Sequence, residues 1–422
     1  MHGTHMNRTS CASSLIHLPK AMRDFLSILH SRQFELLVFL GMGSLALCIL
    51  QFSGQAIYDE GHYLYNTLSF TDGSLKWWAF DTHRGPTGPL YAWVHSLVWN
   101  CLPGVPMLRW MNFILFGLSI ALVSRTSNGW NWQRGLLLLA FPGIFVSAGL
   151  ALTEMISVFF ISLSLCLLEF NPQRKATGGV LLGLAALSRQ TLITQVAAMP
   201  MTDFIRGQNK STLMRTLLGT LLTVAITAPM FLGWRGLLPL DESQESIQSH
   251  SPLNPLNITL GFGYLAIIGG LIWKFTIRLE RRHLWIATST LLLGLGLSAA
   301  LDWKYLPLKS TMIRLFGDSA EWLSYGLPGL SSGIVIAGTY WLFLNRQRLF
   351  TLRMTGTACW TFSLISVAIL VLTNGGIAHQ FSTRYLVVGA PYFAVVFGQF
   401  PARISGFLLL MIGNVLSLLS YA

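Results

Sequence analysis

Two acidic residues, Asp59 and Glu60, stand side by side directly after the first long apolar segment, which covers about residues 34–52. A carboxylate at the edge of a membrane is placed to accept a proton from a sugar or lipid hydroxyl, and apolar surroundings adjust its pKa. Asp59 is therefore the candidate general base, with Glu60 as the substitute. In a helix that begins here, the spacing puts three further polar residues on the face of Asp59, namely His62, Tyr63 and Asn66. The alternative is that the two acids only favour the start of a helix through its dipole.

Basic side chains in the same part of the chain are candidates for binding a phosphate. His83 and Arg84 follow Asp81 and precede a turn with two prolines, in a stretch rich in Trp and Tyr. The arginine guanidinium can donate two hydrogen bonds to phosphate oxygens, and basic groups near a membrane surface attract lipid phosphates. Asp81 is suited to sugar hydroxyls or to a divalent cation. The alternative for His83 and Arg84 is ordinary contact with lipid headgroups.

Two later arginines stand where a positive charge is costly or runs against the overall pattern. Arg189 interrupts an apolar stretch and therefore needs a cavity or a partner, and Glu154, between two short apolar runs, is the natural partner. Gln190 extends this polar step. Arg384 and Tyr385 open a late apolar run on the side where basic residues are scarce, which favours an anionic ligand there. The alternative for Arg189 is a purely structural ion pair with Glu154.

The elements that must position these groups follow from a very apolar composition. The chain has 422 residues, of which 53% are hydrophobic and 10% charged, with a mean hydropathy of +0.56. Soluble proteins carry about 25% charged residues, so these values exclude a water-soluble protein. We expect an all-α polytopic membrane protein with about 11–13 transmembrane helices. The apolar runs lie at about 34–52, 108–125, 135–150, 152–168, 177–190, 191–204, 213–233, 257–276, 284–301, 325–344, 355–373, 385–400 and 404–421.

The distribution of charge predicts the orientation of the chain. There are 28 basic and 16 acidic residues, a net charge of +12, and the basic ones gather in alternate loops, which the positive-inside rule assigns to the cytoplasm. We expect residues 1–33 to form a cytoplasmic N-terminal segment and 34–422 a single transmembrane domain. Its first extracytoplasmic loop, 53–107, holds two amphipathic stretches, about 59–70 and 88–101, that predict interfacial helices. Orientation thus explains the positive charge, and no nucleic-acid partner is expected.

The motifs of several other kinds of chemistry are absent from the sequence. The sequence has no Walker A pattern, no dinucleotide-binding GxGxxG after a strand and no HExxH. Its five cysteines are scattered and form no CxxC pair. No metal site and no cofactor are therefore predicted, although a divalent cation remains open.

The order of these short motifs, over about residues 35–400, resembles that of the GT-C superfamily of membrane glycosyltransferases. The acidic pair opens the first outer loop, and the run 83–93 is similar to the family's His-x-Lys-Pro-Pro-Leu-x-x-Trp element, with Arg84 in place of lysine and the two prolines separated. Three later stretches are also similar to family elements: 108–112, 187–191, and 383–386 with Pro391. The nearest branches are the dolichyl-phosphate-glucose α-1,2-glucosyltransferases, the aminoarabinose transferases and the protein O-mannosyltransferases.

The resemblance implies an inverting glycosyltransferase that moves a sugar from a polyprenyl-phosphate donor to a lipid-linked glycan, lipid or protein acceptor on the extracytoplasmic face. It implies three groups of site residues: Asp59 and Glu60 for catalysis; His83, Arg84, Arg189 and Arg384 at the donor phosphate; and Asp81, His62, Tyr63, Gln190 and Tyr385 at the substrates. The rival interpretation is a secondary transporter or lipid flippase built around Glu154 and Arg189, and a third is a non-catalytic membrane subunit. A compact chain without an endoplasmic-reticulum retention signal favours a bacterial inner membrane, with the endoplasmic reticulum as the alternative.

Overall fold

The computed structural model describes residues 20–57, 59–71, 87–194, 200, 203, 208–234, 255–272, 281–306, 309–344, 383–398, 400 and 402–421. These residues are almost all helical. The elements are α2 (Lys20–Leu50), α3 (Glu60–Thr71), α4 (Leu90–Cys101), α5 (Val105–Ser124), β1 (Arg125–Thr126), β2 (Gly129–Trp130), α6 (Trp132–Leu139), α7 (Ile144–Gly149), α8 (Glu154–Phe170), α9 (Lys175–Ser188), η2 (Gln190–Thr194), α11 (Lys210–Trp234), α13 (Pro255–Ile272), α14 (Arg281–Ala300), α15 (Lys309–Phe316), α16 (Ser319–Leu323), α17 (Gly326–Leu344), η4 (Thr383–Gly389), α20 (Ala390–Phe397) and α21 (Ile404–Leu419).

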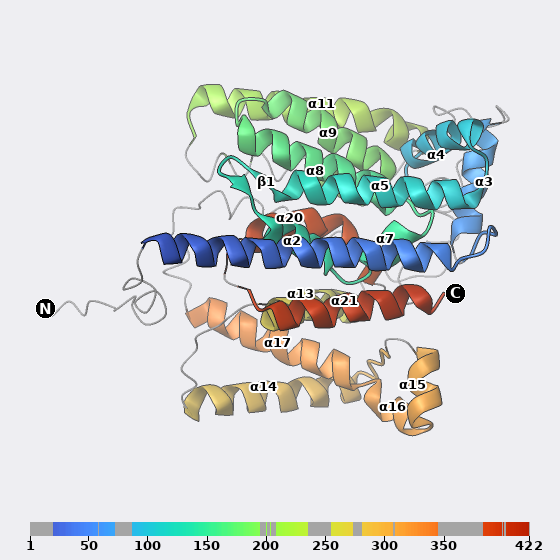
Figure 1. Ribbon diagram of the computed structural model, residues 1–422. Helices are drawn as coiled ribbons and strands as arrows, with labels where there is room; N and C mark the ends of the chain where they lie inside the picture. The colour runs from blue at the N-terminus through green and yellow to red at the C-terminus, as the bar shows by residue number, and fades with distance from the viewer. Residues whose placement is uncertain are drawn as a thin grey trace, which may run out of the picture.

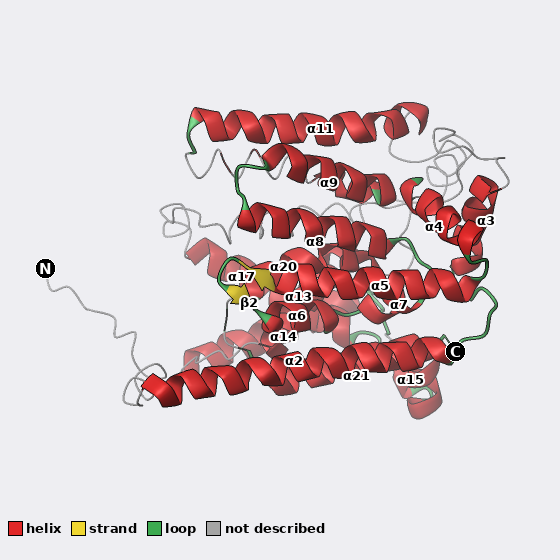
Figure 2. Ribbon diagram, turned by 45° about the horizontal axis from the view of Figure 1, so that its top comes forward, coloured by secondary structure: helices red, strands yellow, loops and turns green. Residues whose placement is uncertain are grey.

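The long helices lie side by side in a row that Figure 1 shows from top to bottom. Helices α11, α9, α8 and α5 pack in that order, and Figure 2 shows the same order from a second angle. Below them come α2 with α6 and α20, then α21 and α13, and finally α17 and α14. We call the end of the bundle that carries α3, α4, α15 and α16 the α4 end. The opposite end, which carries the antiparallel β1–β2 hairpin, is the hairpin end.

Four of the described helices are long and apolar enough to cross a membrane, namely α2, α5, α11 and α13. The buried share of these spans runs from 28% in α11 to 44% in α5, so more than half of each span is exposed or only partly buried. Helix α14 likewise exposes Trp285, Leu292 and Leu293. Large exposed apolar surfaces are unusual in soluble monomers, and this arrangement is compatible with a membrane protein.

The described helices follow most of the predicted apolar runs, but the run 385–400 is divided into the 3-10 helix η4 and the eight-residue helix α20, and other runs also differ. The apolar span of α2, Arg32–Leu50, agrees with the expected run 34–52, although the helix itself begins at Lys20. The run 191–204 opens as a five-residue 3-10 helix, Gln190–Thr194, and most of its remainder lies outside the described residues, as does the run 355–373. The run 135–150 is not one span but two short helices, α6 and α7.

The break between α6 and α7 is held by a residue far away in the sequence. Gly143 takes a left-handed conformation, with φ of 79°, directly after Pro142, and this combination ends one helix and starts another. Asn414 of α21 donates its side-chain amide to the carbonyls of Leu139 and Phe141, at 3.2 and 3.0 Å, and accepts from the Gly143 N–H at 3.1 Å. The buried backbone groups at the break are thereby satisfied.

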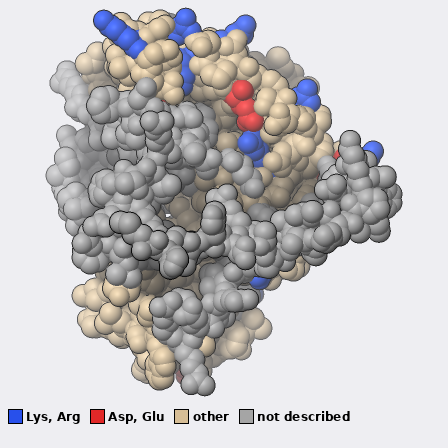
Figure 3. All heavy atoms as spheres, turned by 90° about the vertical axis from the view of Figure 1, so that its left-hand side faces the viewer, with Lys and Arg blue, Asp and Glu red and all other residues tan. Residues whose placement is uncertain are grey.

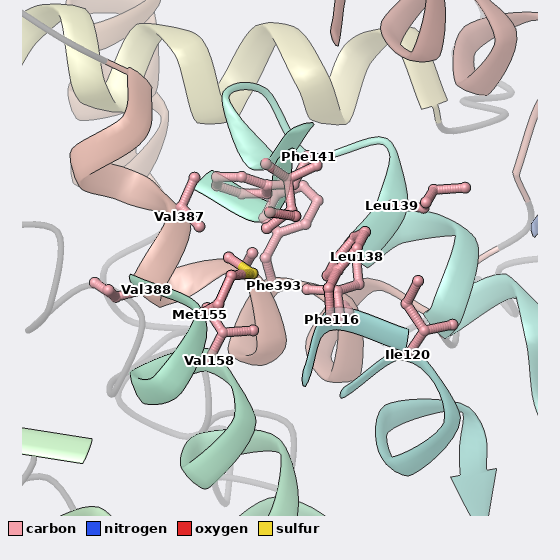
Figure 4. Close-up of a cluster of buried hydrophobic side chains, with 14 of the residues drawn as sticks. Phe116, Ile120, Leu138, Leu139, Phe141, Met155, Val158, Val387, Val388 and Phe393 are labelled. Atoms are coloured by element: carbon pink, nitrogen blue, oxygen red, sulfur yellow. The ribbon is translucent and has the colours of Figure 1, made fainter. Parts of the chain in front are cut away.

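The core lies where α5, α6, α8, η4 and α20 meet (Figure 4). The rings of Phe141 and Phe393 meet edge to face there, with centroids 5.5 Å apart. Phe116 of α5 and Met155 of α8 are fully buried in the same cluster. This packing fixes α8, and with it the residues at its first turn, against α5.

Charge is distributed unevenly over the bundle. On the hairpin end, the described charged side chains are mostly Lys and Arg (Figure 3). An ion pair between Arg134 and Glu169, at 2.6 Å, lies near this end. The α4 end carries Asp302, Lys304 and Glu321, in which the Lys304 ammonium lies 3.2 Å from each carboxylate.

Candidate functional site

The acidic pair lies at the start of α3, but its two members have different surroundings. Asp59 precedes the helix, is partly exposed, and accepts the backbone N–H groups of His62 and Tyr63 through its carbonyl. Glu60 is the first helical residue and is only 1% exposed. The buried face of α3 carries Glu60, Tyr63 and Asn66, whereas His62 is exposed. Tyr63 and Asn66 thus lie on the buried face together with Glu60, and His62 lies outside that face.

The Glu60 carboxylate is fully occupied by hydrogen bonds within the protein. Its Oε1 accepts from Arg109 Nε at 2.8 Å and from the Ala151 N–H at 2.7 Å. Its Oε2 accepts from Arg109 Nη2 at 2.6 Å and from the Ile57 N–H at 2.8 Å. The Arg109 guanidinium also donates to the carbonyls of Ser53 and Gln55. Four donors fill the lone-pair capacity of a carboxylate, so this geometry suits Glu60 to holding the fold.

Buried aromatic and polar side chains connect α3 with α4. The rings of Tyr63 and Tyr91 meet edge to face at 5.4 Å, and Tyr91 meets His95 in the same way at 5.8 Å. The side-chain amide of Asn66 donates to the Tyr91 hydroxyl at 2.6 Å. Burial lowers the pKa of His95 to about 4, partly offset by the neighbouring Asn112 side chain, so His95 is neutral near pH 7.

Glu154 and Arg189 form a buried ion pair between the first turn of α8 and the end of α9. Their side chains are 0% and 7% exposed. Helix α9 ends because Arg189 takes an extended conformation, and Gln190, also buried, then opens the 3-10 helix η2. The Ser157 hydroxyl donates to the Ala185 carbonyl at 3.0 Å and joins the two helices one turn further in.

The start of α4 lies against the end of α9. The Gly88 N–H donates to the Ser188 carbonyl at 3.2 Å, and a Cβ at Gly88 would overlap the carbonyl oxygen of Leu187, so only glycine allows this approach. Ser188 directly precedes Arg189, so this contact places the start of α4, which carries Tyr91, next to the end of α9 at Arg189. The acidic start of α3 and the Glu154–Arg189 pair are thus brought to one region through Tyr63 and Tyr91.

The connection into α8 is held from α5. The Asn112 side-chain amide donates to the carbonyls of Leu150 and Leu152, each at 2.8 Å. Together with the Ala151 N–H bond to Glu60, these contacts fix all three residues of the turn that precedes Thr153 and Glu154. Helix α5 therefore holds the residues around both candidate groups.

The structure brings together part of the predicted site. Asp59, Glu60, Tyr63, Arg189 and Gln190 lie at the α4 end, and the ion pair expected between Arg189 and Glu154 is present. The backbone of Arg384 and Tyr385 lies in η4, which packs against α8, but their side chains are outside the described residues. His83, Arg84 and Asp81 also lie outside the described residues.

Sequence reasoning gave no role to Arg109, Asn112 or His95, all of which are buried at this site. One signal was available for the first two. A charged residue and an amide three positions apart at the start of an apolar helix are as costly as Arg189 in its apolar run, and they need partners for the same reason. Nothing in the sequence near residue 109 identifies those partners, which lie up to 56 positions away.

The described residues contain no group of three or more His, Cys, Asp and Glu side chains that could hold a metal ion. The site as described offers a partly exposed carboxylate, a buried arginine on a carboxylate, and buried hydroxyl and amide groups. A search of protein-family models gives no match to this chain. No curated protein matches the sequence either.

Proposed function

We propose that this chain is an inverting membrane glycosyltransferase of GT-C type, which moves a sugar from a polyprenyl-phosphate donor to a glycan, lipid or protein acceptor at the α4 end. The observation that carries the proposal is the convergence of Asp59 and Arg189 on one region. They come from segments 130 positions apart in the sequence, and the ring contact of Tyr63 with Tyr91 and the Gly88–Ser188 hydrogen bond connect these segments.

The proposed reaction is a single displacement at the anomeric carbon. The acceptor hydroxyl oxygen attacks that carbon, its proton passes to Asp59, and the bond from the sugar to the phosphate oxygen breaks with its electron pair on the phosphate. The Arg189 guanidinium then faces the charge that develops on the leaving phosphate, where a cation already in place stabilises the transition state. Arg84 and Arg384 are the further cations assigned to this phosphate.

The two adjacent acids take different roles in this proposal. Glu60 is engaged by four donors, two of them nitrogens of the Arg109 guanidinium, and these hydrogen bonds withhold its oxygens from an acceptor. Asp59 is partly exposed at the surface of the same end. We therefore assign the base to Asp59 and a structural role to Glu60.

The test is donor consumption by the purified protein in lipid nanodiscs, with polyprenyl-phosphate sugars as donors. Asp59→Asn keeps the shape of the side chain and removes its basicity, so turnover should fall by about 10²–10⁴-fold while donor binding persists. The matched control is Asp318→Asn, an exposed aspartate at the same end. Turnover of Asp59→Asn at the level of this control would refute the assignment of the base.

The orientation of the chain is tested by labelling single cysteines in intact cells. Leu68 on α3 and Asn128 in the hairpin are both exposed and lie at opposite ends of the bundle. We expect a membrane-impermeant thiol reagent to label position 68 from outside, and position 128 only after the membrane is opened. Labelling of position 128 in intact cells would contradict the proposed cytoplasmic N-terminus.

One observation favours a second function, a transporter or lipid flippase. Glu154 and Arg189 are a buried ion pair at the ends of two short helices, and intramembrane ion pairs often mark a transport path. This alternative predicts substrate movement across vesicles without breakage of the donor. Release of polyprenyl phosphate in the donor assay would support the transferase over the transporter.

A further inference from the structure

We propose that Arg109 and Asn112, on a single turn of α5, are positioning residues that set the spacing between Asp59 and the Glu154–Arg189 pair. The catalytic meaning of that spacing rests on the proposed function. The structural claim does not, because it concerns only how two distant segments are held relative to one another. The inference assigns a role to two residues that lie outside the candidate catalytic and substrate-binding set.

The first half of the device holds the start of α3. Arg109 binds both oxygens of Glu60 through Nε and Nη2, at 2.8 and 2.6 Å, and its Nη1 and Nη2 reach the carbonyls of Ser53 and Gln55 at 2.7 and 2.8 Å. These contacts fix the connection from α2 on both sides of the turn that leads to Asp59. The guanidinium also lies 5.3 Å from the centroid of the Phe52 ring. Asp59 thus follows a segment whose backbone is anchored to one side chain.

The second half holds the start of α8. The Asn112 side-chain amide donates to the carbonyls of Leu150 and Leu152. The Glu60 carboxylate accepts the N–H of Ala151, the residue between them. Glu154 follows two residues after Leu152. The Glu60 Oε1 atom is shared between Arg109 and Ala151, so one carboxylate oxygen joins the two halves.

A single helical turn holds its residues at a short and nearly fixed separation. Residues three apart lie on the same face of a helix, with a rise of about 4.5 Å between them. Arg109 is 1% exposed and Asn112 is 0% exposed, and close-packed interiors leave little room for either to shift. A displacement of about 1 Å at this turn would reach both the start of α3 and the start of α8, and misplacement of reacting groups by that amount can cost about 10²-fold in rate.

The chain contains its own matched control for a purely structural role. The Asn414 side-chain amide donates to two carbonyls at the α6–α7 break, those of Leu139 and Phe141. Asn112 binds the carbonyls before α8 in the same way. It is also buried, at 2% exposed, but it touches neither α3 nor the first turn of α8 in these contacts. Arg134, paired with Glu169, is the corresponding control for Arg109.

The first experiment measures geometry and does not depend on activity. Spin labels replace Leu68 on α3 and Leu232 on α11, which packs on α9, because both side chains are exposed. The distance distribution between the labels should broaden or shift in Asn112→Ala and in Arg109→Lys, and should keep its wild-type form in Asn414→Ala and Arg134→Lys. Arg109→Lys retains the charge and loses only the fork, so it gives a readable protein if Asn112→Ala does not fold. A folded Arg109→Lys protein with the wild-type distribution overturns the inference.

The second experiment uses donor turnover in a double-variant cycle. Arg109→Lys alone should lower kcat by about 10²-fold, and this loss should nearly vanish in the Asp59→Asn background, because the group it positions is already absent. The loss caused by Arg134→Lys should be unchanged by Asp59→Asn. If the fold-loss of kcat in the double variant equals the product of the two single fold-losses, the positioning role of Arg109 is overturned. If the wild-type protein consumes no donor, the proposed function fails, and the distance measurement alone decides the positioning claim.

Discussion

Replacement of Arg109 by methionine is the perturbation whose cost follows most directly from the structure. The substitution keeps much of the side-chain volume but leaves the Glu60 carboxylate, 1% exposed, with two of its four donors. The carbonyls of Ser53 and Gln55 also lose their partner. Removal of one member of a buried ion pair costs about 3–5 kcal/mol, because the remaining charge is left in apolar surroundings. We expect the free energy of unfolding of Arg109→Met to fall by that amount.

Unfolding in mixed micelles by titration with dodecyl sulfate measures this cost, provided that the transition is reversible. The double variant Arg109→Met/Glu60→Gln removes the stranded charge, so it should be more stable than the sum of the single changes by about 1–3 kcal/mol. Arg134→Met is the matched control: its partner Glu169 is 25% exposed and solvent screens the pair, so we expect a cost of about 1–2 kcal/mol. A smaller cost for Arg109→Met than for this control, or strict additivity in the double variant, would refute the reasoning.

Two further predictions concern α4 and its surroundings. Gly88→Ala places a methyl group on the carbonyl of Leu187, so it should destabilise the protein by roughly 1–3 kcal/mol, whereas Gly61→Ala, which meets open space within helix α3, should cause no loss of stability in the same unfolding titration. The pKa of His95 falls from an ordinary 6.5 to about 4, so between these values the unfolded chain binds a proton that the folded protein does not. Wild-type stability should therefore drop by about 3 kcal/mol as the pH falls through that window. His95→Gln should abolish this drop, and the exposed His62→Gln should leave it in place; an unchanged pH profile in His95→Gln would show that His95 is not its source.

Some of the site could be predicted from the sequence because its residues are charged and stand within apolar stretches. Glu154 and Arg189 each interrupt an apolar run, and the cost of a lone charge there predicts the pair that the structure contains. The two helices of the first loop follow from their amphipathic pattern and lie within one or two residues of the expected bounds. Local pattern sufficed in both cases, since the relevant energy depends on the residue and its immediate neighbours.

Other parts could not be predicted, because the deciding contacts are remote in sequence. The different surroundings of Asp59 and Glu60 depend on Arg109, which is 49 positions from Glu60. Pro142 and Gly143 mark the division of the run 135–150 locally, but the side chain that satisfies the backbone groups at this break is Asn414, more than 270 positions away. Hydropathy records only that these stretches are apolar, and it carries no information on which distant amide or guanidinium meets a given carbonyl.

The dependence of the α6–α7 break on Asn414 has a consequence for biogenesis. A ribosome delivers α6 and α7 long before α21, so for most of synthesis the carbonyls of Leu139 and Phe141 and the N–H of Gly143 lack the side chain that satisfies them. An unsatisfied backbone group costs several kcal/mol in a hydrocarbon environment, so in a membrane this segment must stay near water, lipid headgroups or an insertion factor until α21 arrives. Nascent chains arrested before residue 414 should accordingly be captured by membrane chaperones and proteases, and release should coincide with the docking of α21.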